Sequence, residues 1–278
     1  MPVSSPARRL IISGGLAVGL SLALGVSAGA QGGAGQACPN ESQTPIVGTA
    51  GDDTLNGTVN ADRLLGGGGD DVINALQGND CVRGGDDFDE IQGGAGRDTI
   101  FGERGPDDLG GGADADRILG GDGFDFLSGG LGDDELFGEG GPDDISGGRG
   151  DDELDGGEDI DFLEGGLGRD ELDGGDDSDR LSGGDDADTI RGGDGNDRLS
   201  GGLDGDRLVG GDGNDLIDGG DGRNSYSGGA GRDVIDAANG SVETINCGGG
   251  RDTVRADATD RLLGCERVFR LRLTKSGN

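Results

Sequence analysis

The stretch GGDGNDRLS (residues 192–200) and the earlier stretch GGAGRDTIF (residues 93–101) follow one nine-residue pattern. Units of this pattern succeed one another without insertion from Gly48 to Asp236, which gives 21 units. Position 1 of the unit is Gly in 20 of the 21 units, position 6 is Asp in 20, and position 8 is Leu, Ile, Val or Tyr in all 21. So strict a period argues against a disordered low-complexity chain, although the sequence is rich in Gly.

The positions of the unit have separate physical interpretations. Gly at positions 1, 2 and 4 permits positive φ, so the first six residues are expected to form a tight turn. Asp and Asn also tolerate the left-handed region, and they alone replace Gly at position 4. Positions 7–9 are expected to form a short strand that directs position 8 inward and positions 7 and 9 outward.

A single unit cannot bury its one apolar side chain. Two units, 18 residues, can close one rung whose two strands face each other, and stacked rungs about 4.8 Å apart form two parallel sheets. The sequence therefore predicts an all-β fold, a parallel solenoid with 18 residues per rung and about ten rungs. Collagen is excluded, because the period of Gly is not three and Pro is scarce.

The carboxylates at position 6 make such a stack unfavourable without a cation. Residues 18 apart, such as Asp134 and Asp152, are expected on adjacent rungs of one edge, where rows of like charge repel each other. Burial of one apolar side chain per unit is too small to offset the entropy of ordering the chain. The ion-free chain is therefore expected to be largely unfolded. Ca²⁺ accepts about six to eight oxygen ligands in a tolerant geometry, whereas Mg²⁺ demands a stricter octahedron and soft metals favour His or thiolate.

The unit resembles the G-G-x-G-x-D-x-U-x nonapeptide of RTX (repeats-in-toxin, hemolysin-type) calcium-binding proteins, and the resemblance covers about two thirds of the chain. The resemblance implies a parallel β-roll in which Ca²⁺ lies between successive turns of one edge. It also implies that the ligands are position-6 carboxylates and backbone carbonyls of the Gly-rich turns. The implied carboxylate ligands are Asp53, Asp62, Asp71, Asp80, Asp89, Asp98, Asp107, Asp116, Asp125, Asp134, Asp143, Asp152, Asp161, Asp170, Asp179, Asp188, Asp197, Asp206, Asp215 and Asp233.

The number of ions has an upper bound. Pairing each unit with the unit two ahead gives at most 21 − 2 = 19 Ca²⁺ sites. The site at Asn224 lacks the carboxylate charge and is expected to be the weakest.

The composition excludes several kinds of protein. The chain has 57 acidic and 22 basic residues, a net charge of −35, and no His. Zinc proteases of the H-E-x-x-H kind, Ser-His-Asp hydrolases and Cys-His proteases all need an imidazole. The charge also disfavours nucleic acid and anionic lipid as partners, since both require Lys and Arg to neutralise phosphate.

The two ends of the chain differ from the repeats. Residues 1–30 combine Arg8 and Arg9, an apolar run from 10 to 26 and a small-residue exit, which predicts a secretory signal peptide, although the paired Arg leaves a twin-arginine signal open. Residues 31–47 are expected to form an N-terminal linker or cap, residues 48–236 the roll, and residues 237–278 a C-terminal cap. Within that cap the alternation of apolar and basic residues over 268–273 predicts a final strand.

Four cysteines, an even number, permit disulfides in an exported chain. Three connectivities are possible. We favour Cys38–Cys81 together with Cys247–Cys265, because each pair would staple one end.

Two functional hypotheses follow. The first is a secreted calcium-binding repeat protein that serves as a structural, surface or adhesion module and is not an enzyme. Its partners would be calcium ions and, at the cell surface, extracellular polysaccharide or protein, with no stable membrane span after removal of the signal peptide. The alternative is a calcium-dependent polysaccharide-acting enzyme, a lyase or glycosidase on a solenoid, since paired acids can perform acid–base chemistry. The regular spacing of the acids favours the first.

Overall fold

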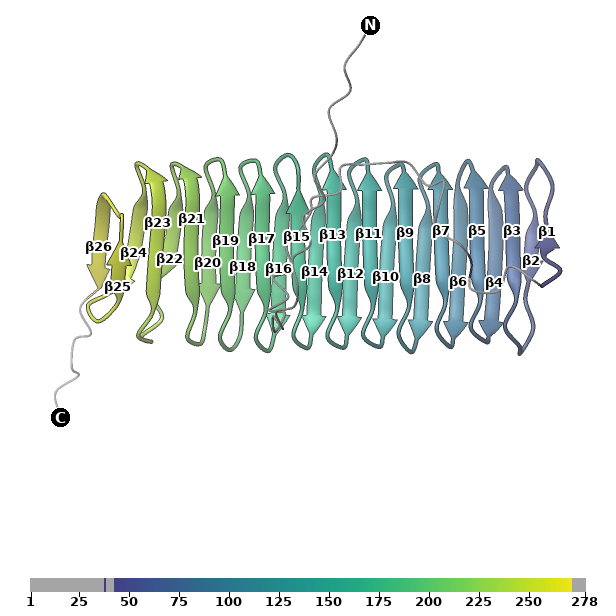
Figure 1. Ribbon diagram of the computed structural model, residues 1–278, viewed down its shortest axis with the longest axis horizontal. Coiled ribbons are helices and arrows are strands. Elements are labelled where there is room, and N and C mark those ends of the chain that lie inside the picture. The colour runs from purple at the N-terminus through teal and green to yellow at the C-terminus, as the bar shows by residue number, and fades with distance from the viewer. Residues whose placement is uncertain (1–37, 39–42, 272–278) are drawn as a thin grey trace, which may run out of the picture. The chain divides into compact units, whose positions relative to one another are not determined.

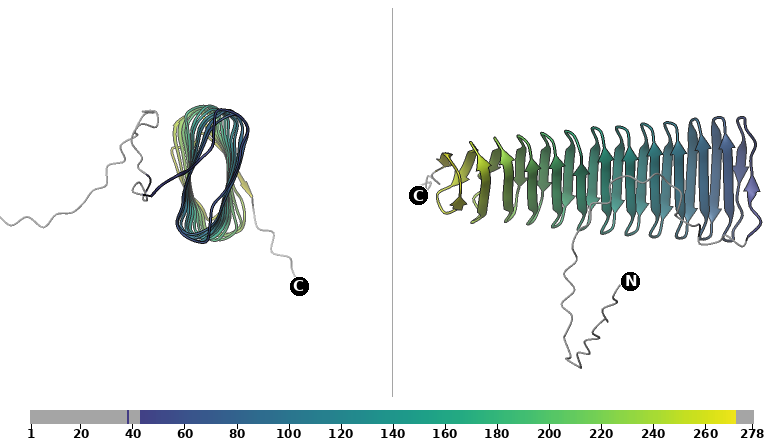
Figure 2. Two further views of the ribbon diagram at one scale, coloured as in Figure 1. Left: turned by 90° about the vertical axis from the view of Figure 1, so that its right-hand side faces the viewer. Right: turned by 45° about the horizontal axis from the view of Figure 1, so that its top comes forward.

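The computed structural model describes residue 38 and residues 43–271, and 26 strands, but no helix, lie in this part of the chain. The odd-numbered strands form one parallel sheet of 13 strands, and the even-numbered strands form a second. The chain alternates between the two sheets, so that each strand pairs with the strand two ahead of it (Figure 1). Viewed along the stack, the two sheets face each other (Figure 2). The predicted all-β parallel solenoid is therefore confirmed.

The strands are short and evenly spaced. The first sheet contains β1 (Ile46–Val47), β3 (Arg63–Gly68), β5 (Cys81–Asp86), β7 (Thr99–Arg104), β9 (Arg117–Asp122), β11 (Glu135–Gly140), β13 (Glu153–Glu158), β15 (Glu171–Gly175), β17 (Thr189–Asp194), β19 (Arg207–Asp212), β21 (Ser225–Gly231), β23 (Thr244–Gly250) and β25 (Arg261–Leu263). The second sheet contains β2 (Thr54–Asn56), β4 (Asp71–Gln77), β6 (Asp89–Ala95), β8 (Asp108–Ala113), β10 (Phe126–Leu131), β12 (Asp144–Arg149), β14 (Phe162–Leu167), β16 (Arg180–Asp185), β18 (Arg198–Gly202), β20 (Leu216–Gly220), β22 (Val234–Ala237), β24 (Thr253–Asp257) and β26 (Arg267–Leu271).

The register of the strands confirms the predicted rung of two nonapeptide units. Leu136 lies opposite Leu154 in one sheet, and Leu216 lies opposite Val234 in the other, so partners are two units apart in the sequence. Each sheet has 13 strands instead of about ten, because β23–β26, from the region expected to form the C-terminal cap, continue both sheets, and β1, which precedes the first unit, adds a strand to the first sheet. The strand predicted over 268–273 is observed as β26 up to Leu271, and residues 272 and 273 lie outside the described residues.

The core is a single file of position-8 side chains between the two sheets. Leu and Ile residues at this position are buried, and Leu136, Ile145 and Leu154 are at most 1 % exposed. Positions 7 and 9 on either side of them point outward, as predicted from the period of two in a strand. Tyr226 is the one aromatic residue in this file, and it is also buried.

The turns use positive φ at positions 2 and 4 of the unit. At position 4, all six Asp residues that replace Gly have φ between 64° and 78°, which confirms the interpretation of that position. Glu103 and Glu139 stand at position 2 with φ of 82° and 72°. The Gly at position 1 does not have positive φ, so the expectation that conformational freedom explains it is wrong. Its role is to leave space beside the carboxylate of position 6, as shown below.

The rung length changes near the C-terminal end. Ser225 lies opposite Thr244, which makes that rung one residue longer than two units, whereas Thr244 lies opposite Arg261 in a rung that is one residue shorter. The rung from Thr253 to its partner Arg267 is shorter still. The sheets continue across these changes because the inward apolar residue still stacks, as Ile245 does on Tyr226.

Both favoured disulfides are present. Cys38 bonds to Cys81 in β5, so the segment before β1 is tied back across the first rungs of its sheet. Cys247 in β23 bonds to Cys265, which follows β25, and this bond staples the last rungs.

Some predicted segments fall outside the described residues. The signal peptide over 1–30 and most of the linker over 31–47 lie there, as do the last residues of the cap. Within the described part, no apolar helix is long enough to span a bilayer.

Candidate metal sites along the turn edges

The twenty Asp residues predicted as ligands stand in two rows, one along each turn edge of the roll. In each row, neighbours are two units apart in the sequence and belong to adjacent rungs. One row contains Asp53, Asp71, Asp89, Asp107, Asp125, Asp143, Asp161, Asp179, Asp197, Asp215 and Asp233, and the other contains Asp62, Asp80, Asp98, Asp116, Asp134, Asp152, Asp170, Asp188 and Asp206.

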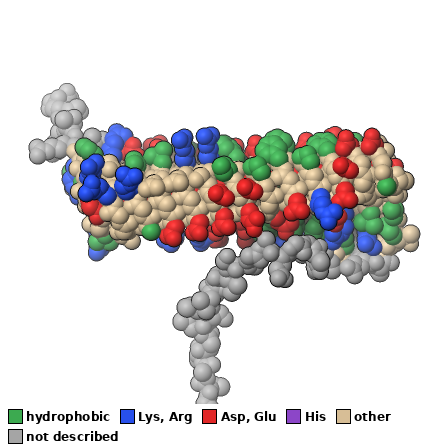
Figure 3. Space-filling view, turned by 90° about the horizontal axis from the view of Figure 1, so that it is seen from above, with side chains coloured by type: hydrophobic (Ala, Val, Ile, Leu, Met, Phe, Trp, Pro, Cys, Tyr) green, Lys and Arg blue, Asp and Glu red, His purple; other side chains and the backbone are tan. Residues whose placement is uncertain are grey.

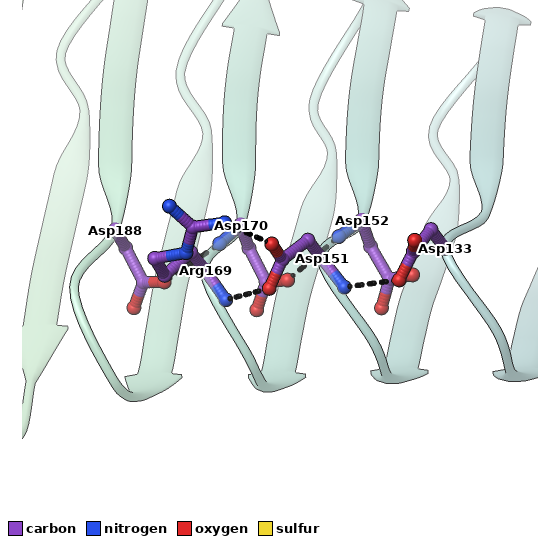
Figure 4. Close-up of polar contacts among 6 residues, drawn as sticks. All are labelled: Asp133, Asp151, Asp152, Arg169, Asp170 and Asp188. Carbon is purple, nitrogen blue, oxygen red and sulfur yellow. Dashed lines mark hydrogen bonds and ion pairs between the residues drawn. The ribbon is translucent and has the colours of Figure 1, made fainter.

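One oxygen of each carboxylate is used within the fold. The backbone N–H of Asp134 donates to Oδ1 of Asp152 at 2.8 Å, and the N–H of Asp152 donates to Oδ1 of Asp170 at 2.9 Å. Figure 4 shows this ladder, in which each Asp accepts a hydrogen bond from the Asp one rung earlier. The ladder orients every position-6 side chain after the first rung, whose Asp53 and Asp62 only donate to it.

Position 5 forms a second ladder that runs in the opposite direction. Oδ1 of Asp133 accepts from the N–H of Asp151 at 3.0 Å, and Oδ1 of Asp151 accepts from the N–H of Arg169 at 3.0 Å (Figure 4). These side chains are exposed, and Arg169 also forms an ion pair with Asp151. The buried position-6 ladder and the exposed position-5 ladder therefore connect successive rungs with hydrogen bonds that run in opposite directions.

The second oxygen of the buried carboxylates has no hydrogen-bond partner. This holds for Oδ2 of 18 of the 20 predicted residues, all except Asp53 and Asp62, and these side chains belong to residues at most 3 % exposed. A buried carboxylate oxygen without a partner is costly in a protein interior. Its repetition along both edges indicates that a group outside the chain completes each site.

The space beside each orphaned oxygen is bounded by another acceptor. A Cβ added at Gly147 would lie 2.5 Å from Oδ2 of Asp152 and 2.8 Å from the carbonyl oxygen of Gly165 on the next rung. The other edge repeats this arrangement, since a Cβ at Gly120 would lie 2.5 Å from Oδ2 of Asp125 and 2.9 Å from the carbonyl oxygen of Gly138. Position 1 is therefore Gly because two oxygen acceptors converge beside its Cα.

These donor atoms suit a hard cation that accepts peptide carbonyls. Nowhere in the described ranges do three or more Asp, Glu or Cys side chains form a cluster that could hold a metal by themselves. A carboxylate oxygen and a backbone carbonyl oxygen at each site match the ligand types that Ca²⁺ uses. The orphaned Oδ2 and the space beside Gly thus fit calcium, and the predicted position-6 Asp residues are candidates to hold it.

Burial makes ionisation of these carboxylates unfavourable in the absence of an ion. Burial is the largest cause that raises the pKa of Asp107, Asp116 and Asp161 to about 8, against the lowering effect of the backbone hydrogen bond. The same balance raises the pKa of Asp152 and Asp188 to about 7, and the carboxylates of neighbouring rungs raise it further. A cation in the site would remove this penalty.

The first rung satisfies its carboxylates internally. Oδ2 of Asp62 accepts hydrogen bonds from the N–H of Thr58 at 2.6 Å and from its hydroxyl at 2.8 Å. Asp53 accepts from the N–H and the hydroxyl of Thr49 in the same way, at 2.5 and 2.9 Å. The two carboxylates that lack an orphaned oxygen are thus those whose units have Thr in place of Gly.

Asn224 occupies the one unit in which position 6 is not acidic. Its amide nitrogen donates to the carbonyl oxygen of Gly219 at 3.0 Å and lies 3.3 Å from the hydroxyl of Tyr226. A Cβ at Gly219 would meet the Tyr226 hydroxyl and, at 2.6 Å, the amide nitrogen. Hydrogen-bond donors thus take the place that the orphaned oxygen has elsewhere. The site predicted as the weakest is closed by the chain itself.

Both edges of the buried ladder continue beyond the 21 units into acidic residues that were not among the predicted ligands. The N–H of Asn224 donates to Glu243 at 3.0 Å, and the N–H of Glu243 donates to Asp260 at 3.1 Å. On the other edge, Asp233 donates to Asp252 and Asp252 donates to Glu266, each at 3.0 Å. A local signal exists, because each of the four acidic residues stands two residues before an apolar one, as position 6 does before position 8.

Comparison with known families identifies the repeat. A family model for the RTX calcium-binding nonapeptide repeat matches residues 47–82, 77–109, 110–145, 137–172, 146–181, 173–206 and 200–235, which together span more than half of the chain. A search of curated proteins finds no match.

Filling the space beside one position-1 Gly should remove one ion. We expect Gly147→Ala to lower the number of bound Ca²⁺ ions by one, because the added methyl group would occupy the space beside Oδ2 of Asp152. The matched control is Gly51→Ala, where a Cβ meets nothing within 4 Å. Isothermal titration calorimetry gives the stoichiometry of both variants. Equal stoichiometry in the two would show that the space beside Gly147 does not hold an ion.

The site at Asn224 should bind an ion when its hydrogen-bond donors are replaced. The double variant Asn224→Asp/Tyr226→Leu restores the residues that other units have at positions 6 and 8. We expect it to bind one Ca²⁺ more than the parent chain, since a second carboxylate oxygen would replace the amide nitrogen and the phenol hydroxyl. An unchanged stoichiometry, measured by the same calorimetry, would contradict this interpretation of the Asn224 site.

Protonation of the buried carboxylates should partly stabilise the fold when no cation is bound. The pKa values of the buried Asp residues are raised on folding, so the folded ion-free chain binds more protons than the unfolded chain. The ion-free roll is therefore most stable near pH 4 and loses stability as the pH rises toward 8. We expect the far-ultraviolet β signal in excess chelator to be larger at pH 5 than at pH 8. Identical spectra at the two values would contradict the proposed cost of ionisation.

Proposed function

Because the chain belongs to the family of RTX calcium-binding nonapeptide repeat proteins, we propose that it is a calcium-stabilised structural module. In this proposal the chain folds outside the cell and acts there as a surface or adhesion element without catalysing a reaction.

The orphaned carboxylate oxygens are the observation that supports calcium as the stabilising ligand. Repeats of this family bind calcium, and here they form a parallel β-solenoid. The ions would be held by Oδ2 of the position-6 Asp residues and by backbone carbonyl oxygens of position 1, along both edges. Bound Ca²⁺ would supply the positive charge that these acceptors lack. The chain itself supplies the ladder of backbone hydrogen bonds that orients each carboxylate in the folded roll.

Two features support a place outside the cell. The charged start, the apolar run over 10–26 and the small residues from Ala28 to Ala30 are typical of a secretory signal. All four cysteines are paired in disulfides, which persist mainly in oxidising compartments. The extracellular supply of calcium would then couple folding to export.

The regularity of the buried acids favours a structural role over catalysis. A catalytic pair of carboxylates needs two groups whose environments push their pKa values apart at one place. Here each position-6 Asp has nearly the same environment as its neighbours, with the same backbone donor and the same dominant effect of burial. The alternative, a polysaccharide-acting enzyme, would need a distinct pair elsewhere on the solenoid.

The coupling of folding to calcium can be measured directly. We expect the mature chain at pH 8 to show little β signal by circular dichroism in chelated buffer and to fold cooperatively as Ca²⁺ reaches the millimolar range. Mg²⁺ at the same concentration should not replace it, because that ion demands a stricter octahedron. A strong β signal that persists in excess EGTA would overturn the proposal.

A further inference from the structure

Two arginines lie side by side on the outer face of the second sheet. Arg180 begins β16 and Arg198 begins β18, and the two are in direct register on neighbouring parallel strands. Parallel neighbours are about 4.8 Å apart, so the guanidinium groups project from adjacent rungs. Both side chains are exposed. We call these two residues, together with Phe162, Ser182 and Ser200, the arginine strip.

Neither arginine has an ion-pair partner among the described residues. The ion pairs of that part of the chain involve other arginines, although acidic residues outnumber basic ones by 57 to 22 in the whole sequence. Like charges placed directly opposite each other on neighbouring strands are destabilising. What sets Arg180 and Arg198 apart is their direct register, and an anion bound between them from outside the chain would offset this repulsion.

The first sheet offers an internal comparison. There Arg83 lies over the ring of Phe101 at 4.2 Å and pairs with Glu103, so the cation and the aromatic ring satisfy each other. Arg117 does the same with Phe137 at 4.4 Å and with Glu135. The arginine strip has the same residue types, but in the described part neither Arg180 nor Arg198 stacks on Phe162. Its cations and its ring remain available to a ligand.

The surroundings of the two arginines form a shallow groove. Phe162 lies in register with Arg180 and is 44 % exposed, and Ser182 lies in register with Ser200. These residues line a groove of about 230 Å³. In Figure 3, which looks onto a turn edge, hydrophobic and basic side chains lie next to each other along one long side of the roll. The groove thus combines an aromatic ring, two cations and two hydroxyl groups on the outer face of one sheet, and Glu164 and Asp218 flank the two serines in their row.

The apolar part of this surface continues along the roll. Phe126, two strands from Phe162 in the same row, is 45 % exposed, and the ring of Phe124 meets it edge to face with centroids 4.9 Å apart. Asp144 lies between Phe126 and Phe162 in this row. The Asp144 carboxylate would repel an anionic group at that point of the row, so the acidic group of a ligand is expected at Arg180 and Arg198. The row follows the strands' stacking direction and suits a linear polymer.

We propose that the arginine strip binds a linear polysaccharide that carries carboxylate groups. The guanidinium groups of Arg180 and Arg198 would together bind one carboxylate of the polymer between them. The Phe162 ring would cover the apolar face of a sugar, and the serine hydroxyls would exchange hydrogen bonds with sugar hydroxyls. This inference deepens the proposed function and rests on it, because the strip exists only when the roll is folded.

The test compares calcium-loaded proteins that differ in the strip. The variants are Arg180→Ser/Arg198→Ser and Phe162→Ser. The matched control is Arg207→Ser, which removes an exposed arginine from the equivalent position of the first sheet. The probes are a hyaluronan decasaccharide, poly-glutamate of similar charge and neutral maltohexaose, with binding measured by calorimetry. Circular dichroism in calcium reports separately whether each protein is folded.

We expect the parent chain to bind hyaluronan and the double arginine variant to bind it at least about tenfold more weakly. The Arg207→Ser control should bind within about twofold of the parent, and Phe162→Ser should weaken hyaluronan but not poly-glutamate. Thermal stability of the double variant should not fall, since two opposed like charges are removed. This combination separates a binding role from a structural one.

Three results with the charged probes would overturn the inference. They are no binding of hyaluronan by the folded parent chain, equal binding by the double arginine variant, or equal affinity for poly-glutamate and hyaluronan. Tight binding of maltohexaose that is unaffected by the arginine substitutions would also contradict the role of charge. If calcium fails to produce the β signal at all, the proposed function fails first, and circular dichroism identifies that case.

Discussion

The structure depends on a buried carboxylate oxygen that the chain leaves without a partner. On each rung, the position-6 Asp uses Oδ1 to accept a backbone hydrogen bond from the rung before, while Oδ2 faces a carbonyl oxygen across the space beside a Gly. Both atoms are acceptors, so neither can satisfy the other. The fold therefore requires positive charge at regular intervals along two edges, and the most suitable source is a hard divalent cation.

The exceptions to the repeat support this view, because each removes the unpartnered oxygen in its own way. Thr58 in the first rung donates its N–H and hydroxyl to Asp62, and Asn224 near the other end supplies an amide nitrogen where the oxygen would stand. Both exceptions lie close to the ends of the nonapeptide array. The ends are also where Cys38–Cys81 and Cys247–Cys265 connect rungs covalently. Disulfides and internal hydrogen bonds thus occur near the ends of the array, where a terminal rung has a neighbour on one side only.

The edges and the outer faces of the roll are under different constraints. Position 1 leaves the space beside Oδ2, position 6 forms the buried ladder, and position 8 forms the core. These three positions therefore vary little in residue type. Positions 7 and 9 point outward and differ from rung to rung, from the Arg83–Phe101 contact on one sheet to the exposed Arg180 and Arg198 on the other. Because the repeat fixes the spacing of these outward residues, any recognition of a partner must depend on which residues occupy them. The proposed arginine strip uses that freedom.

The sequence alone determined the solenoid, its rung of two nonapeptide units, the inward file of position 8 and the residues that carry the carboxylates. It could do so because one apolar side chain and one acid per unit admit few arrangements that bury the former. Only the tertiary structure decided that position 1 needs Gly for space rather than for positive φ, since that space is bounded by the next rung. The tertiary structure also decided how the buried ladder continues on both edges, through Glu243, Asp252, Asp260 and Glu266. The rungs at this end differ in length, so the nine-residue period is lost in the sequence although the strands still stack in space.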